Sequence, residues 1–424
     1  MNSPSFSAML LVSISLLVAC NGSNAAPQLT ARPTHTAEED QRASPVAMGL
    51  AALPSPSSTS EATVTQVLGT TLTPRPKTTP TQSAVAASQF PCVPTVEGTQ
   101  VLLSKDDRER LNLRFWPDGN IGATLLGSNF TLFAANSGKI GRLVGTLDNP
   151  VQESVQTGIQ IEHLKTTLNY AGGGPVYQDP GSGLLLIIYH GEVWSGSDPT
   201  RFTSLLGMAK STDNGNSWAD LGPIIMPNGQ SRQGGTEVGG GAFLLIGGYF
   251  YIYFRDTLET GAVNEVAVAR AGVAEVISAA NNNQTVRLSK YFNGAWSEPG
   301  LGGRSSPLEP GNPQARWLDV SYNEAMKGYI MVVASNKDGS NVFLYLTQSW
   351  DGLTWGPRQV IQALGGENFY PTIIGANNKP RTSGERFYVI HTRSTAGGFQ
   401  RWTDALVMRM LLSCVPPKPN EAPK

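Results

Sequence analysis

From about residue 90 to residue 415 the chain repeats one pattern, in which a strand of small or aromatic residues turns at Gly or Asn into a strongly apolar strand. The pairs are 120–126 with 130–134, 175–178 with 184–189, 241–245 with 249–254, 318–322 with 328–333, and 370–374 with 386–390. A third strand follows most pairs, at 205–209, 265–269, 342–346 and 406–410. Apolar runs of this kind, rich in Val, Ile, Tyr and Phe, are typical of strands buried on both faces.

Sheets of three or four strands that recur every 50–70 residues or so favour a β-propeller, whose blades bury their faces on each other. The sequence therefore predicts an all-β domain over 90–415, a five-bladed β-propeller, with one helical insert at 271–280 and a disordered tail at 416–424. The 46 Gly and 29 Pro residues suit short strands joined by tight turns.

The N-terminal region has the composition of an export signal followed by a spacer. The apolar run 9–19 is too short for a stable membrane anchor, and Leu17-Val18-Ala19-Cys20 resembles the lipoprotein box of bacteria. We expect a signal peptide at 1–20, lipidation of Cys20, and a protein anchored to the outer face of the bacterial membrane only through that lipid. The alternative is an ordinary secretory signal with a chance Cys, since 1–7 lack Lys and Arg. Residues 21–89, rich in Ala, Ser, Thr and Pro, are predicted to be a disordered linker.

Charge and cysteine usage restrict the partners and the compartment. The net charge of −1, with 15% charged residues, argues against nucleic acid as a partner, and we expect a monomer. Cys92 and Cys414 bracket the predicted domain. In an oxidising compartment they are predicted to form a disulfide that ties its ends together, the alternative being two unpaired thiols.

Two turns carry a motif found in sugar-processing propellers. Residues 211–218 match Ser-x-Asp-x-Gly-x-x-Trp, the Asp-box, and 349–355 are a shortened version. We interpret Asp213 and Asp351 as scaffold, because Asp caps such a turn, Gly takes a positive φ and Trp packs beneath. With these turns, the blade count and the hairpins, residues 95–413 resemble the five-bladed propeller glycosidases, which include arabinanases, β-xylosidases and levansucrase-like enzymes. Sialidases, which have six blades and an arginine triad, are the next resemblance.

Polar residues gather where first strands start and second strands end, and in antiparallel hairpins these points share one face. Glycosidic cleavage commonly needs two carboxyl groups, and the resembling enzymes use three acids from different blades. By position, Asp118 would be the base, Glu237 the acid and Asp319 the tuning carboxylate, with Glu192 and Asp256 nearly as good. The flanks Pro117–Gly119 and Thr236–Val238 differ from the family's motifs. Candidate substrate-binding residues are His190, Arg255, Arg316, Tyr322, Tyr370, His391 and Arg393, with Tyr189 and Trp194 as further stacking residues.

No nucleotide-binding, zinc or serine-nucleophile motif is present, so no cofactor is expected; a channel Ca²⁺ ion held with the help of His391 is an unsupported alternative. The leading hypothesis is an extracellular glycoside hydrolase acting on a poly- or oligosaccharide. The alternatives are a non-catalytic carbohydrate-binding or adhesion propeller, and a sialidase-like enzyme, which would need three clustered arginines beside a tyrosine–carboxylate pair.

Overall fold

The computed structural model describes residues 92–152, 154–196, 198–229, 238–256, 265–309, 312, 314–336, 342–362, 366–377, 379–394 and 404–414, all within the second of two compact units, Lys77–Lys424. The predicted signal peptide, Cys20, the linker, the tail and Glu237 lie outside these residues. In the part of the chain that is described, neither helix has the length and apolar character needed to cross a bilayer.

Most of the described chain is β-strand, and its strands form four sheets. The first contains β2 (Gly122–Leu126), β3 (Asn129–Ala135), β4 (Ile140–Gly145) and β5 (Ser154–Ile159). The second contains β6 (Ile161–Glu162), β7 (Tyr170–Gly172), β8 (Val176–Gln178), β9 (Leu185–Ser195), β10 (Asp198–Ser211) and β11 (Trp218–Ile225). The third contains β12 (Gly239–Ile246), β13 (Tyr249–Asp256), β14 (Glu265–Gly272), β15 (Ser289–Phe292) and β16 (Ala295–Pro299).

The fourth sheet has nine strands and divides into two antiparallel runs. One run contains β17 (Ala315–Asn323), β18 (Gly328–Asn336), β19 (Val342–Ser349) and β20 (Gln359–Gln362), with β22 (Thr382–Ser383) parallel to β17. The other contains β21 (Glu367–Gly375), β23 (Arg386–Ser394), β24 (Leu406–Ser413) and β1 (Thr95–Leu103). A single parallel pair, Val342 with Glu367, joins the runs.

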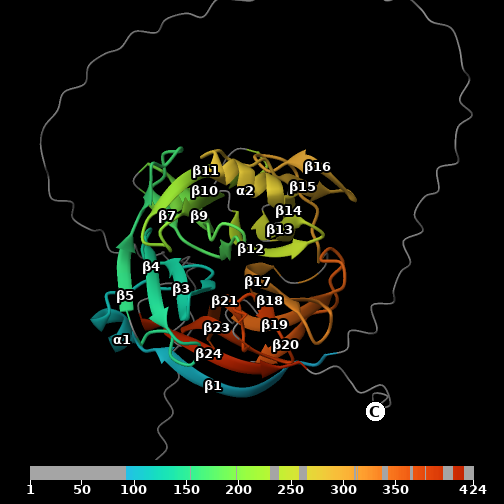
Figure 1. Ribbon diagram of the computed structural model, residues 1–424. Helices are drawn as coiled ribbons and strands as arrows, with labels where there is room; N and C mark the ends of the chain where they lie inside the picture. The colour runs from blue at the N-terminus through green and yellow to red at the C-terminus, as the bar shows by residue number, and fades with distance from the viewer. Residues whose placement is uncertain are drawn as a thin grey trace, which may run out of the picture. The chain divides into compact units, whose positions relative to one another are not determined.

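The sheets follow one another around a common centre in chain order, as Figure 1 shows. An apolar cluster lies between each sheet or run and the next. Ile188 and Phe250 belong to the cluster between the second and third sheets, and Leu318 and Tyr253 to that between the third sheet and β17–β20. A further cluster packs Leu132 of β3 against Val407 of β24, so the end of the domain contacts its beginning.

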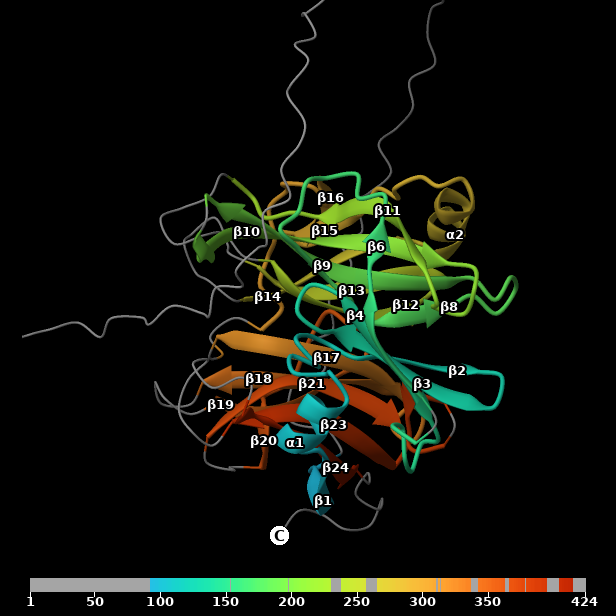
Figure 2. The ribbon, with the colours of Figure 1, turned by 90° about the vertical axis from the view of Figure 1, so that its left-hand side faces the viewer.

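The N-terminal strand completes the last sheet. β1 pairs antiparallel with β24, and the two strands lie side by side in both views (Figure 1, Figure 2). Cys92 and Cys414, which are 322 residues apart in sequence and 5.2 Å apart between Cα atoms, are joined by a disulfide next to this pair. Both cysteines are buried, and the covalent link holds together the two chain segments that close the domain.

The two helices are local additions to the sheets. α1 (Lys105–Arg110) is capped by Ser104, whose hydroxyl accepts from the Asp107 N–H at 3.1 Å, and its buried Arg108 donates to the carbonyl of Ala405 before β24. α2 (Val273–Asn281) matches the helix predicted at 271–280 but begins two residues later, because Ala271 and Gly272 still pair in β14.

The turns at 211–218 and 349–355 are held by their aspartates. Asp213 accepts from the Ser217 N–H at 3.0 Å, and Asp351 accepts from the Thr354 N–H at 2.7 Å. Gly215 and Gly352 have φ values of 81° and 75°, which side chains with a Cβ rarely adopt. Trp218 is fully buried beneath the first turn. These contacts assign both aspartates to the scaffold, as the sequence predicted.

Candidate active site

Four chain segments have their starts together at one end of the domain, where Asp118 contacts Tyr170 and Arg255 contacts Trp317, and their later residues together around one cavity. They are 118–124 leading into β2, β7 with β8, β12, and β17. Each is paired antiparallel with the strand that follows it, and Gly239 at the start of β12 faces Arg255 at the end of β13. Starts of inner strands and ends of their partners therefore meet at one end, where the sequence predicted the site.

Asp118 is held at this end by two tyrosines from other sheets. The Tyr170 hydroxyl donates to Oδ2 of Asp118 at 2.9 Å, and the Tyr370 hydroxyl donates to Oδ1 at 3.1 Å. Tyr170 begins β7, and Tyr370 lies in β21 with a φ of 54°, at a shift in the pairing of β21 with β23. Asp118 thus accepts hydrogen bonds from neutral donors, and its carboxylate remains half-buried.

Glu192 is a second half-buried carboxylate at the same end, supplied by β9. Its Oε1 lies 3.3 Å from Nε2 of His190, and its Oε2 accepts from the indole N–H of Trp194 at 2.8 Å. Glu192 faces Tyr170 across the β7–β9 pair, and the rings of Tyr170 and His190 meet edge-on at 6.1 Å. Asp118 and Glu192 therefore share Tyr170 as a common neighbour.

Arg255 and Trp317 form the third side of the cluster. The Arg255 guanidinium lies 4.7 Å from the centre of the Trp317 ring, a cation–π geometry. The Trp317 ring contacts Tyr370 at 4.8 Å and His190 at 6.1 Å, and its indole N–H donates to the side chain of Asn120. A Cβ at residue 239 would collide with Nε of Arg255, so the glycine at the start of β12 makes room for this side chain.

Burial and charge in the cluster shift the pKa values of its members. Burial, followed by the Asp118 carboxylate, raises the pKa of Tyr170 well above its usual value, and the same two causes act on Tyr370. Burial lowers the pKa of Arg255 to about 10, while Tyr370 and Glu192 raise it and nearby Arg316 lowers it. The tyrosines therefore remain neutral donors and Arg255 remains cationic at neutral pH.

Of the predicted site residues, six meet in this cluster. They are Asp118, His190, Glu192, Arg255, Arg316 and Tyr370. Arg316 lies at the edge, where its Nε donates to Asn336 Oδ1 at 3.0 Å. The sequence interpretation missed Tyr170 and Trp317. The signal for Trp317 was its place beside Arg316 at the start of an inner strand, and Tyr170 was missed because unit two was taken to start at Pro175.

The prediction that Asp319 is a tuning carboxylate at this end is wrong. Asp319 is fully buried in the middle of β17 and accepts from both Nη atoms of Arg381, at 3.1 and 3.0 Å, and from the Ile373 N–H at 2.7 Å. The strand starts at Ala315, three residues earlier than the predicted start, so Asp319 lies four residues inside it. Its carboxylate is engaged by Arg381, whose hairpin belongs to the other end of the domain.

Asp256 is also placed away from the cluster. Neighbouring residues of a strand point to opposite faces, and Asp256 turns away from Arg255 into a buried ion pair with Lys290, at 3.2 Å. It also accepts from the Ser305 hydroxyl at 2.7 Å. The catalytic role predicted for Asp256 is therefore corrected to a structural one.

Most of the remaining residues predicted to bind substrate lie either in the buried core or at the opposite end of the domain. His391 is completely buried, which lowers its pKa to about 4, so it cannot contact substrate at a rim; Arg393 on the same strand is half-buried. Tyr189 is also fully buried, and its hydroxyl donates to Asp220 at 2.9 Å. Tyr322 is at the end of β17, opposite the cluster, and lines a different cavity.

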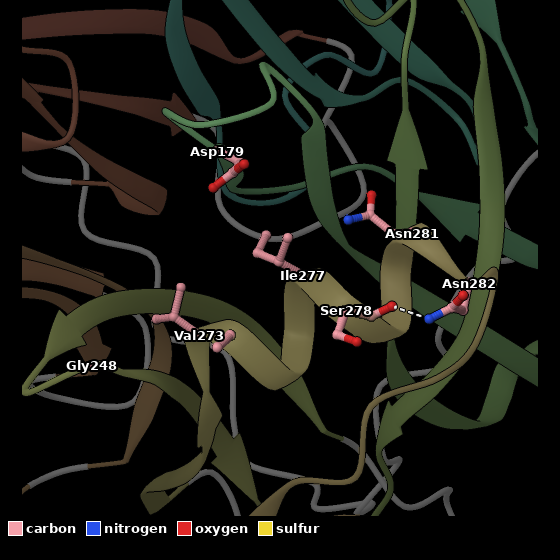
Figure 3. Close-up of a pocket in the computed structure, with 8 residues that line it drawn as sticks. Asp179, Gly248, Val273, Ile277, Ser278, Asn281 and Asn282 are labelled. Carbon is pink, nitrogen blue, oxygen red and sulfur yellow. Dashed lines mark hydrogen bonds between the residues drawn. The ribbon is translucent and has the colours of Figure 1, made fainter.

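Two hollows outside the cluster can be described. A wide depression of about 770 Å³ runs along α2, between the turn at Asp179 and the exposed side of the helix, as Figure 3 shows. Val273 and Ile277 line it, and Asn282 Nδ2 donates to the Ser278 carbonyl at 2.9 Å. The other, of about 460 Å³, is the cavity that Tyr322 lines. Among the described residues no group of three or more His, Cys, Asp or Glu side chains is placed to hold a metal ion.

Comparisons with known proteins give similarities of fold. No family model matches the chain, and no curated protein matches it. The catalytic domain of a GH62 α-L-arabinofuranosidase from Coprinopsis cinerea is 9% identical, with a TM-score of 0.47 over 76% of this chain and 97% of that one. An α-L-arabinofuranosidase from Podospora anserina, solved in complex with cellotriose, is 9% identical, with a TM-score of 0.44 over 70% and 90%. A protein of unknown function from Dyadobacter fermentans is 11% identical, with a TM-score of 0.44 over 69% and 75%.

Proposed function

We propose that the described unit is a five-bladed β-propeller, with the nine-stranded sheet counted as two blades, and that it is a glycoside hydrolase. Two features support the blade count: the nine-stranded sheet divides at the β19–β21 pair, and apolar clusters lie between consecutive sheets as well as between the last and the first. Such a ring brings residues from distant parts of the sequence to one mouth.

The observation that carries the activity is the placement of Asp118 and Glu192, two half-buried carboxyl groups that have Tyr170 as a common neighbour. Hydrolysis of a glycosidic bond needs one group that protonates the leaving oxygen and one carboxylate that activates water or attacks the sugar. Among the aromatic rings at the same end, that of Trp194 is half-buried and suits the apolar face of a sugar ring.

The surroundings of the two acids suggest their roles. Asp118 accepts from two neutral hydroxyls, which favours its charged form, so we assign it as the base or nucleophile. Glu192 lies across Tyr170 from Asp118 on the neighbouring strand, so we assign it as the acid that protonates the leaving oxygen. Glu237 keeps its predicted acid role as a competing assignment.

Kinetics of the full chain test both assignments. The panel holds neutral oligosaccharides, sialyllactose, and aryl glycosides with good and poor leaving groups. We expect Asp118→Asn to lower kcat/KM by about 10²–10⁴-fold on every substrate, and Glu192→Gln to do so mainly where the leaving group needs protonation. Glu162→Gln, an exposed carboxylate on β6, is the matched control. Full activity of Glu192→Gln together with loss in Glu237→Gln would transfer the acid role to Glu237.

A second candidate is a binding protein without hydrolysis, and one observation favours it. Arg255, Trp317 and Tyr370 are each at most 7% exposed, so much of the cluster is packed against itself. If that is its role, oligosaccharides bind without turnover and Asp118→Asn alters only the Kd. Release of sialic acid from sialyllactose would instead favour the sialidase-like alternative, for which Arg255 and Arg316 supply two neighbouring arginines.

We further propose that the chain is exported and lipid-anchored through Cys20 to the outer face of a bacterial membrane, with 21–89 as the spacer. The lipobox-like sequence before Cys20 supports this. Incorporation of labelled fatty acid into the wild-type chain but not into Cys20→Ser is the expected result, and equal labelling of both would refute it.

A further inference from the structure

The cavity of about 460 Å³ lies at the end of the domain opposite Asp118 and Glu192. Its lining comes from the ends of the same inner segments whose starts build the cluster: Thr124, Tyr177, Gln178, Phe243, Tyr322 and the hairpin residue Arg381. Along β17, Arg316 at the cluster and Tyr322 at the cavity are six residue steps apart, which is roughly 20 Å of extended chain. The cavity is therefore a separate site.

Arg381 is fixed in this cavity by the buried Asp319. Its Nη2 donates to Asp319 Oδ1 and to the Val320 carbonyl, and its Nη1 donates to Asp319 Oδ2. These bonds use three of the five N–H donors of a guanidinium. The side chain is 17% exposed and lines the cavity, and its buried Nε–H has no partner among the described residues. A rigid donor is thus presented where the cavity opens.

Aromatic rings form the walls around Arg381. The guanidinium lies 5.4 Å from the centre of the Phe243 ring, and Tyr177 meets Phe243 edge-on at 6.2 Å. Tyr322 is 38% exposed and rests against Tyr329 at 5.6 Å, so its outer face is open to a ligand. Planar faces combined with fixed polar groups are the chemistry that recognises a sugar ring.

The charges lining the cavity cancel in pairs. Arg381 is balanced by Asp319, and Lys379 is balanced by Glu324 at 2.6 Å. Thr124 and Gln178 add a hydroxyl and an amide, joined at 3.0 Å. A site with paired charges and hydroxyl or amide groups has no excess cation for an anionic ligand, and it offers both donors and acceptors to hydroxyl groups.

We propose that this cavity is a second carbohydrate site, which binds a neutral sugar unit against the exposed ring of Tyr322, with Arg381 as its fixed donor. Asp319 acts as a positioning residue for Arg381. The site is independent of hydrolysis at Asp118 and Glu192, and in a chain-degrading enzyme it would hold a polysaccharide at the opposite face of the domain.

Calorimetric titration of the full chain tests this proposal. The Asp118→Asn background prevents turnover, and the probes are neutral xylo-, cello-, arabino- and malto-oligosaccharides of three to six units. We expect Tyr322→Ala to weaken binding of at least one probe by about tenfold or more, and Tyr322→Phe, which keeps the ring, to retain it. Trp350→Ala removes a ring that is 46% exposed and outside the cavity lining, and should bind like the parent.

The outcomes separate the two proposals. Equal affinity of Tyr322→Ala and its parent for every probe would overturn the second site. Absence of binding by any neutral probe up to 10 mM or so would overturn it as well. If Tyr322-dependent binding is found and the wild-type chain hydrolyses nothing, the second site stands and the proposed hydrolase activity fails.

Discussion

The two ends of the inner strands carry the same kinds of side chain in different arrangements. At one end Asp118 accepts from the hydroxyls of Tyr170 and Tyr370, while Arg255 is stacked on Trp317. At the other end Arg381 donates directly to Asp319 through both Nη atoms. Both arginines also contact an aromatic face, so the difference lies in what each carboxylate accepts from.

This difference decides what each carboxylate can do. A buried carboxylate held by an arginine fork is fixed and charge-balanced, which suits it to positioning another group. A half-buried carboxylate that accepts from tyrosine hydroxyls remains exposed enough for a proton or a sugar carbon to reach it. The contrast teaches that burial and the donors around an aspartate of an inner strand decide its role, and that its position along the strand does not.

The largest expected effect is on stability, when each aspartate is made neutral. Asp319→Asn leaves Arg381 without its counter-charge, and we expect a loss of about 3–5 kcal/mol in the free energy of unfolding, nearer 3 because Arg381 is partly exposed. Asp118→Asn should cost about 2 kcal/mol, because it weakens the bonds from both tyrosine hydroxyls while its amide oxygen still accepts from a hydroxyl. Urea unfolding of the three proteins measures the difference.

A double variant tests whether the stability loss of Asp319→Asn comes from the broken ion pair with Arg381. Arg381→Met with Asp319→Asn removes both charges together, so it should recover part of the stability lost in Asp319→Asn alone. Equal losses for Asp118→Asn and Asp319→Asn would contradict the distinction between the two ends.

The sequence predicted the β class, the strand pairs and the end of the domain at which most site residues meet. It could do so because apolar runs mark buried strands, and polar residues at strand ends share a face. Its errors have local causes. Asp319 was misplaced by a strand start read three residues late, and Asp256 by the alternation of side chains along β13. Tyr322 closes an inner strand, so it belongs to the opposite end.

Other parts of the site could not be read from the sequence at all. The hydroxyl bonds to Asp118 join residues 52 and 252 positions away, and only the closed packing of sheets brings them together. The edge contact of Trp317 with His190 likewise crosses between sheets. The residue pattern of one strand does not predict which side chains of another sheet will contact it.

An effect of about the same size, but confined to acidic pH, separates the two histidines of the predicted rim. His391 is fully buried and its pKa falls to about 4, so the unfolded chain binds more protons between that pH and the ordinary value of 6.5. Stability should therefore decrease as the pH falls from about 6.5 to 4, by roughly 3 kcal/mol in total, and should be unaffected by this group above that window.

Thermal or urea unfolding across pH 4–8 measures this contribution. His391→Gln should have a flatter profile than the wild-type chain. His190→Gln, which alters a histidine at the cluster with a side chain 12% exposed, is the comparison variant. A wild-type profile in His391→Gln would show that His391 does not remain neutral in the folded protein.

The smallest expected effect is the stability lost when a single tyrosine hydroxyl is removed, at the cluster or at the opposite end of the domain. Tyr370→Phe removes one donor to Asp118, and we expect a loss of about 1–2 kcal/mol, as for a hydrogen bond to a charged group. Tyr322→Phe should lose almost nothing, because its hydroxyl has no hydrogen-bond partner among the described residues. In the background of Asp118→Asn the cost of Tyr370→Phe should shrink, because the acceptor is then uncharged, and the difference between the two costs measures the interaction itself. If that cost is the same with aspartate and with asparagine, Tyr370 stabilises the domain by packing alone and the carboxylate at this end is not held by its hydroxyl.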